Sequence, residues 1–185
     1  MSTEPRPIDA QKRAYDRTSY ILVVDDDNTL LKFFKIHLNK FFSKVIVVKN
    51  AKEAIETLAE KEIDLVISDI RMPRMDGLQL MKKIRKHDPA IPILLISGAL
   101  LTGDQAEKID EADGYLRKPF EVDALHAFIN KGMEIREQYK RLIDCIPDKQ
   151  NFRDVLRGKI KLEKAVNAEH IEIAKEIIGG IKKAS

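Results

Sequence analysis

The sequence has no tryptophan and a single cysteine, Cys145, in 185 residues. One cysteine excludes a disulfide within the chain, and without clustered histidines it offers no zinc site. Apolar runs are short, and none approaches the roughly 18 residues that a membrane-spanning helix requires. Residues 1–19 are too polar for a secretory signal and are expected to form a mobile leader. These absences together predict a cytoplasmic protein without a membrane span.

The composition is that of an ordinary globular protein, with 44% hydrophobic and 34% charged residues. A chain of this length can bury one sizeable core and carry a small appendage, but it cannot contain two full-size domains. The net charge of +3 is unevenly distributed. Residues 20–130 contain 16 Lys and Arg against 18 Asp and Glu, whereas residues 131–185 contain 13 against 9. The C-terminal part is therefore the basic part of the chain.

Short apolar runs alternate with amphipathic stretches from residue 20 onward, which is typical of a parallel sheet with crossover helices. Five runs are predicted to be buried strands: Tyr20–Val24, Lys44–Val48, Leu65–Ser68, Ile93–Ser97 and Tyr115–Arg117. Three stripes at helical spacing lie between them: Leu30, Leu31, Phe34 and Leu38; Ala51, Ala54, Ile55 and Leu58; Leu78, Met81, Ile84 and Arg85. A fourth, short and polar helix is expected around Asp104–Glu111. The alternation predicts an α/β fold with a doubly wound, five-stranded parallel sheet.

Polar side chains follow four of the predicted strands, at the edge of the sheet where such folds carry their sites. If the strand order is 2-1-3-4-5, the acids after the first and third strands converge, and a cation must offset their charge. Carboxylates with room for water suit Mg²⁺. A hydroxyl and a lysine complete a site for an anionic group attached to one carboxylate. The residues are Asp25, Asp26 and Asp27, then Asp69, Ser97 and Lys118.

These strand ends resemble the signatures of bacterial response-regulator receiver domains of the CheY-like type. The match covers about Tyr20 to Asn130, and four motifs in register make it specific. The motifs are Leu22–Asp26, Ile67–Gly77 (I-S-D-I-R-M-P-R-M-D-G), Ile96–Gly98 and Tyr115–Phe120. Two features depart from the family pattern. Ser97 stands where Thr is frequent, and the stretch from Ser97 to Lys118 is about one residue short.

The resemblance implies a role for each matching residue. Asp69 would be the phosphoacceptor, Lys118 and the Ser97 hydroxyl would contact phosphoryl oxygens, and Ser97 with Tyr115 would form the switch. Mg²⁺ would be held by Asp26, Asp69 and the Arg71 carbonyl, with Asp25 acting through water. Asp27 is interpreted as a helix cap, and the Lys118–Pro119 bond is expected to be cis. Such a domain is a phosphoacceptor rather than an enzyme, and its phosphoryl donor is a histidine kinase or phosphotransfer protein.

Residues 131–185 are predicted to form a helical C-terminal extension. Two series with seven-residue spacing extend the fifth helix to about residue 146: Phe128, Ile135 and Leu142, with Leu125, Gly132, Tyr139 and Ile146. The stripe could join two copies in a homodimer, or it could fold back as an ordinary core face or pack on the next helix. A helix break at Gly132 would favour folding back.

Two short helices are predicted next, over Phe152–Val166 and Ala168–Ile178, with Asn151 and Asn167 as caps and Gly179–Gly180 as terminator. The first carries Arg153, Arg157, Lys159, Lys161 and Lys164, which we interpret as a solvated basic face. The same face could also meet an acidic partner or a membrane surface. No helix-turn-helix signature is present, so nucleic acid is not the expected partner.

Three functions remain open. The first is a receiver that signals by phosphorylation-dependent protein–protein contact or dimerisation. The second is a DNA-binding transcriptional response regulator whose extension is a reduced effector. The third is a phosphatase with an acid nucleophile, because residues 25–27 mimic its D-x-D motif; the M-D-G and K-P-F matches oppose it.

Overall fold

The computed structural model describes residues 19–98, 103 and 108–184. Its centre is a parallel sheet of five strands in the order β2-β1-β3-β4-β5, which confirms the predicted fold class and strand order. The strands are β1 (Tyr20–Val24), β2 (Lys44–Val48), β3 (Leu65–Asp69), β4 (Ile93–Ser97) and β5 (Gly114–Arg117). Strands β3 and β4 are buried at every residue, because helices cover both faces of the sheet.

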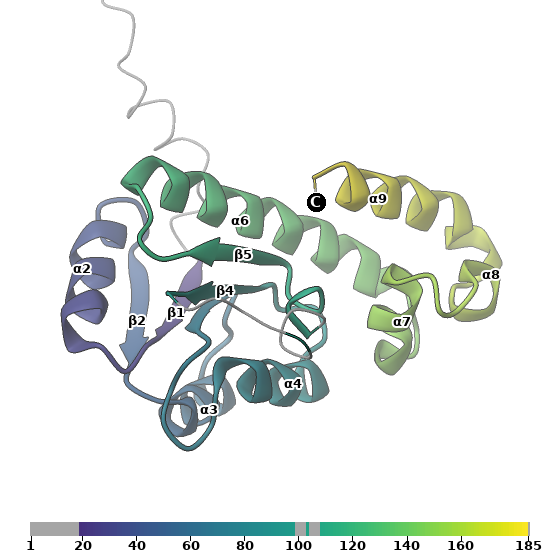
Figure 1. Cartoon of the computed structure of the whole chain (residues 1–185). Coiled ribbons are helices and arrows are strands. Elements are labelled where there is room, and N and C mark those ends of the chain that lie inside the picture. Colours follow the sequence, from purple (N-terminus) through teal and green to yellow (C-terminus); the bar gives the residue numbers. More distant parts are fainter. Residues whose placement is uncertain (1–18, 99–102, 104–107, 185) are drawn as a thin grey trace, which may run out of the picture.

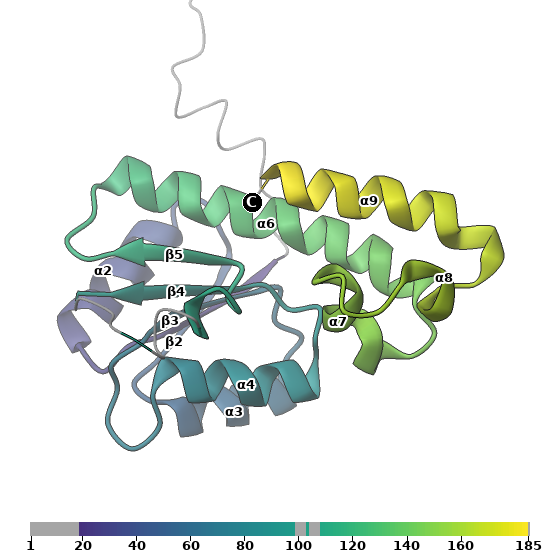
Figure 2. The ribbon, with the colours of Figure 1, turned by 45° about the vertical axis from the view of Figure 1, so that its right-hand side comes forward.

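Helices cover the sheet in two layers (Figures 1 and 2). On one face lie α2 (Asn28–Leu38) and the first half of α6 (Val122–Cys145). The opposite face is covered by α3 (Ala51–Glu60) and α4 (Gly77–His87). The predicted stripes supply both cores, and Asp27 caps α2 by accepting from the Thr29 and Leu30 N–H groups, as predicted. The helix predicted around Asp104–Glu111 falls largely outside the described residues.

The fifth helix, α6, has 24 residues and runs past the sheet at its C-terminal half (Figure 1). It continues through Gly132 without a break. This glycine allows close approach of the helix to the sheet. A Cβ there would lie 2.8 Å from Leu65 and 2.9 Å from Leu94 side-chain atoms. The heptad stripe is buried within the chain. Its first half packs on the sheet and its second half packs on the helices that follow, although the helix break that we associated with folding back is absent.

We call residues 146–184 the tail. It contains η1 (Lys149–Asn151), α7 (Phe152–Leu156), α8 (Leu162–Ala165), η2 (Ala168–His170) and α9 (Ile171–Ala184). In both ribbon views α9 lies beside α6 (Figures 1 and 2). Together the tail and the second half of α6 enclose a third core that includes Leu142, Phe152, Val155 and Ile177.

The predictions for the tail were wrong in three respects. The helix predicted over Phe152–Val166 is divided, because Gly158 adopts a φ of +69° between α7 and α8. Gly179–Gly180 lies inside α9 rather than ending it. Neither Asn151 nor Asn167 forms a side-chain capping bond. Among the described residues, no helix has both the length and the apolar character that crossing a membrane would require.

Candidate functional site

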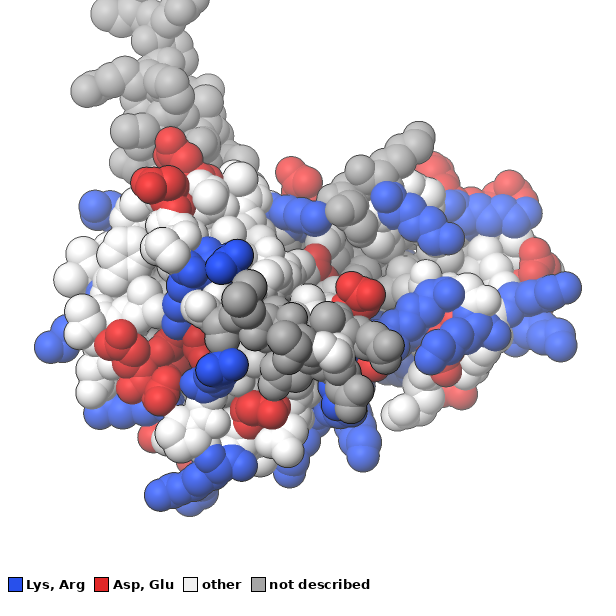
Figure 3. All heavy atoms as spheres, in the orientation of Figure 1, with Lys and Arg blue, Asp and Glu red and all other residues white. Residues whose placement is uncertain are grey.

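The carboxyl edge of the sheet brings together the four predicted polar positions. Asp25 follows β1, Asp69 ends β3, Ser97 ends β4 and Lys118 follows β5. The Lys118 Nζ lies 2.6 Å from Asp69 Oδ1 and 2.8 Å from Asp25 Oδ2. The parallel order places β1 beside β3 and β3 beside β4, so residues up to 93 positions apart meet here. Figure 3 shows acidic side chains gathered at this end of the molecule, with basic ones beside them.

The electrostatics of this cluster favour a charged lysine. The Asp25 and Asp69 residues are 3% and 7% exposed, so their charges are poorly hydrated. Burial raises the pKa of Asp69 above its ordinary value, although the hydrogen bond and charge of Lys118 act in the opposite direction. Burial alone would lower the pKa of Lys118, but its bonds to Asp25 and Asp69 outweigh this effect and raise it. The ammonium group therefore stays protonated and stabilises both carboxylates.

The loop after β3 fits closely around Asp69. The Arg71 N–H donates to Asp69 Oδ2, which leaves each carboxylate oxygen with one partner of its own. Gly77 begins α4 against the Asp69 backbone, where a Cβ would lie 2.2 Å from the Asp69 carbonyl oxygen. The glycine of the M-D-G motif is thus required by close backbone contact rather than by a turn. Asp76, beside it, caps α4 in a capping box with Gln79.

Ser97 and Tyr115 lie on adjacent strands. Ser97 is 1% exposed, and its carbonyl accepts from the Lys118 N–H at 2.8 Å. Tyr115 is half-buried and pairs in register with Leu95, two residues before Ser97. The Lys118–Pro119 bond is cis, as the resemblance predicted.

The donor set suits a magnesium ion that keeps some of its waters. Asp26 is exposed at the rim, next to buried Asp25. Over the described ranges, no three His, Cys, Asp or Glu side chains form a group that could hold a metal by themselves. Mg²⁺ typically takes only one or two carboxylates and fills its octahedron with water, so carboxylates such as those of Asp26 and Asp69, with a backbone carbonyl, are donors of the kind it takes.

A family model described as "Response regulator receiver domain" matches residues 21–130. The chain belongs to this family. We call residues 21–130 the receiver.

Known relatives share the receiver. The transcriptional regulatory protein GlrR of Escherichia coli (strain K12) is 32% identical over 119 residues, which are 64% of this chain and 27% of GlrR. The response regulator ArlR of Staphylococcus saprophyticus is 31% identical over 143 residues, which are 75% of this chain and 64% of ArlR. A crystal structure of a response regulator receiver domain protein from Clostridium thermocellum has a TM-score of 0.58 and 28% identity, covering 64% of this chain and 97% of that chain. The chain thus spans about a quarter of the length of GlrR.

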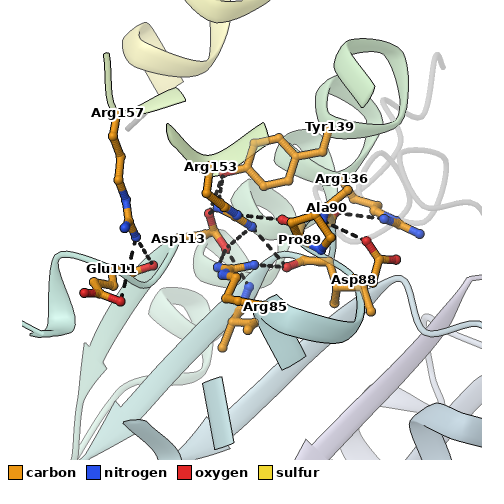
Figure 4. Close-up of polar contacts among 12 residues, drawn as sticks. Arg85, Asp88, Pro89, Ala90, Glu111, Asp113, Arg136, Tyr139, Arg153 and Arg157 are labelled. Atoms are coloured by element: carbon orange, nitrogen blue, oxygen red, sulfur yellow. Dashed lines mark hydrogen bonds and ion pairs between the residues drawn. The ribbon is translucent and has the colours of Figure 1, made fainter. Parts of the chain in front are cut away.

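One prediction about the basic extension was wrong. Arg153 does not belong to a solvated face, because its side chain is 13% exposed and ion-paired with Asp113 of the receiver (Figure 4). Lys159, Lys161 and Lys164 are exposed as predicted. Basic side chains are prominent over the tail in Figure 3. The sequence offered one signal of the buried cluster, namely Arg85 within the apolar stripe of α4.

Two histidines that the sequence places singly within separate amphipathic helices contact each other. His37 of α2 and His126 of α6 lie with their Nε2 atoms 2.7 Å apart and their rings stacked. Burial lowers the pKa of both residues. The lowered pKa values favour the neutral imidazoles, of which one can donate to the other.

Proposed function

We propose that this receiver accepts a phosphoryl group on Asp69 from a histidine kinase or phosphotransfer protein and signals through protein–protein contacts. The observation that carries the proposal is the position of the Lys118 ammonium, within 2.8 Å of both Asp25 and Asp69. A cation beside a buried carboxylate can stay in place when that carboxylate gains a doubly charged group. A site of this kind stabilises an acyl phosphate.

In the proposed reaction, a carboxylate oxygen of Asp69 attacks the phosphorus of a phosphohistidine. The new P–O bond forms as the P–N bond breaks, and the electron pair of that bond returns to the imidazole nitrogen. Lys118 would move one hydrogen bond to a phosphoryl oxygen, and the Ser97 hydroxyl would contact another. The chain itself is thus the acceptor, and further chemistry is limited to loss of the phosphoryl group.

Mg²⁺ would be held by Asp26, Asp69 and the Arg71 carbonyl, with Asp25 reaching it through water. The ion would neutralise charge on the transferring phosphoryl group.

The test is labelling by a small phosphodonor such as acetyl phosphate, with Mg²⁺, in the full chain. Asp69→Asn should abolish labelling. Asp76→Asn is the matched control, because it makes the same change seven residues away and an asparagine can still cap α4. Labelling that persists in Asp69→Asn, or is lost equally in Asp76→Asn, would refute the assignment.

A second candidate function is transcriptional regulation through DNA binding by the tail. It is favoured by the names of relatives, such as the transcriptional regulatory protein GlrR, and by the exposed Lys159, Lys161 and Lys164. Arg153 cannot contribute, since it is committed to the receiver. DNA affinity that falls steeply with salt, and that is lost when these three lysines become glutamine, would support this candidate.

A further inference from the structure

Arg153 of the tail enters the receiver beside strand β5 (Figure 4). Its Nη1 lies 2.8 Å from Asp113 Oδ1 and its Nε lies 2.6 Å from the Pro89 carbonyl oxygen. Further bonds reach the Ile91 carbonyl and the Tyr139 hydroxyl. The guanidinium also lies over the Tyr139 ring, 4.6 Å from its centroid. One side chain therefore joins the tail to the receiver at several points.

Asp113 is in turn held firmly by the receiver and by the second half of α6. Its carboxylate accepts from Arg85, from the Tyr139 hydroxyl and, at 2.8 Å, from the Ile93 N–H at the start of β4. Burial alone would raise the pKa of Asp113, but the charges of Arg85 and Arg153 outweigh it and hold the pKa well below its ordinary value. The carboxylate is thus charged whenever the chain is folded near neutral pH.

Strand β5 connects this contact to the phosphoacceptor site. Asp113 immediately precedes β5 and donates its own N–H to Ile93, while Lys118 immediately follows β5 and donates its N–H to Ser97. Only the four residues of β5 separate the two. The Lys118 ammonium contacts Asp25 and Asp69 as free carboxylates. At least one of these two contacts must change when Asp69 carries a phosphoryl group.

The tail also faces Tyr115 of β5. A cavity of about 450 Å³ is lined on the receiver side by Tyr115 and on the tail side by Arg157, Ile178 and Ile181. A change in the position of β5 or of the Tyr115 ring therefore alters the surroundings of α7 and α9.

We propose that the tail is an intramolecular partner of the receiver, docked through Arg153 and Asp113, and that docking favours the free-carboxylate arrangement of Lys118 and Asp69. This inference rests on the proposed function, because it requires Asp69 to be the group that is modified. Modification of Asp69 weakens docking through β5. By reciprocity, loss of docking strengthens modification by the same factor.

The experiment measures both directions in the full chain, with beryllofluoride and Mg²⁺ as the probe. Hydrogen exchange is followed in peptides from α7 and α9, and beryllofluoride affinity is measured by calorimetry. We expect beryllofluoride to accelerate exchange in these helices. We expect Arg153→Met to bind beryllofluoride more tightly, by a factor of about 5 or more, which is the lower end of usual coupling.

Lys159→Gln is the matched control. It also removes one positive charge from the tail, but the Lys159 side chain is 63% exposed and its 3.9 Å pair is with Asp154 of the tail itself, so the affinity should not change. Arg153→Lys keeps the charge and should fall between wild type and Arg153→Met. One outcome overturns the inference and leaves the proposed function standing. In that outcome beryllofluoride binds the wild type without changing its hydrogen exchange, and Arg153→Met binds beryllofluoride no more tightly than the wild type does. If Arg153→Met does not fold, exchange in the wild type decides. If the wild type binds no beryllofluoride, both the inference and the proposed function are overturned.

Discussion

Neutralising Asp113 should destabilise this protein more than removing either of its arginine partners. The carboxylate lies between two guanidinium groups whose side chains are only 12% and 13% exposed, those of Arg85 and Arg153. Asp113→Asn preserves the shape of the residue but removes the charge that offsets these two cations. The asparagine amide also brings N–H donors to positions where arginine donors already point.

The sizes of the effects follow from what each variant leaves behind. Removing one member of a buried ion pair costs about 3–5 kcal/mol when the partner charge stays uncompensated, and Asp113→Asn leaves two such charges. Arg153→Met leaves Asp113 with Arg85, Tyr139 and the Ile93 N–H, so it should cost about 1–3 kcal/mol in lost hydrogen bonds. The double variant should cost less than the sum by about 1–3 kcal/mol, because one of the two repelling cations is gone.

Urea unfolding at pH 7, followed by circular dichroism, measures these free energies in the full chain. Glu111→Gln and Arg157→Gln are the controls, since their long, exposed pair joins the same two parts of the molecule and should contribute about 0–1 kcal/mol. The reasoning is refuted if Asp113→Asn costs no more than Glu111→Gln, or if Arg153→Met costs more than Asp113→Asn.

Three further predictions concern backbone contact and pH. Gly77→Ala should cost at least about 1–3 kcal/mol in urea unfolding and reduce phosphodonor labelling, because its Cβ would overlap the Asp69 carbonyl; wild-type labelling would contradict the contact. Stability should fall as the pH drops through 6.5, the ordinary His value, since the lowered pKa of His37 and of His126 disfavours their protonated forms in the folded state. Thermal melts of a His37→Gln variant should show a smaller loss between pH 7 and 5, and an equal loss would disprove it. The depressed pKa of Asp113 contributes stability that is complete above pH 3.8 and is lost as the pH falls below that value, so Asp113→Asn should flatten the acid limb of melts that are extended below pH 3.8.

The sheet and its site could be predicted because their signals are local. Each strand is a short apolar run, and the polar residue that ends it marks the carboxyl edge. Parallel order then brings Asp25, Asp69 and Lys118 together without any knowledge of side-chain packing. The cap at Asp27 is local in the same sense, since it depends on residues within three positions.

The contacts of the tail could not be predicted because their partners are distant in sequence. Arg153 lies 40 residues from Asp113, and nothing near either residue identifies the other. Helical periodicity grouped Arg153 with the exposed lysines. Periodicity cannot show that an acidic residue from a distant part of the chain faces one of these positions and buries it. The His37–His126 contact spans 89 residues and was missed for the same reason. Gly158, whose positive φ divides the predicted helix, was a local signal that amphipathic spacing outweighed.

The heptad stripe of α6 can serve only one partner at a time. Tyr139 and Leu142 of this stripe are 3% and 0% exposed, and Tyr139 packs edge-on against Phe152 of α7 with ring centroids 5.1 Å apart. The hydroxyl of the same tyrosine bonds Asp113 and accepts from Arg153. A second copy could reach the stripe only after α7 and α9 had left it, and their departure would break the Arg153–Asp113 pair. Dimerisation through α6 and docking of the tail are therefore mutually exclusive uses of one surface, so any event at β5 that releases the tail also exposes the second half of the stripe, at Ile135, Tyr139 and Leu142.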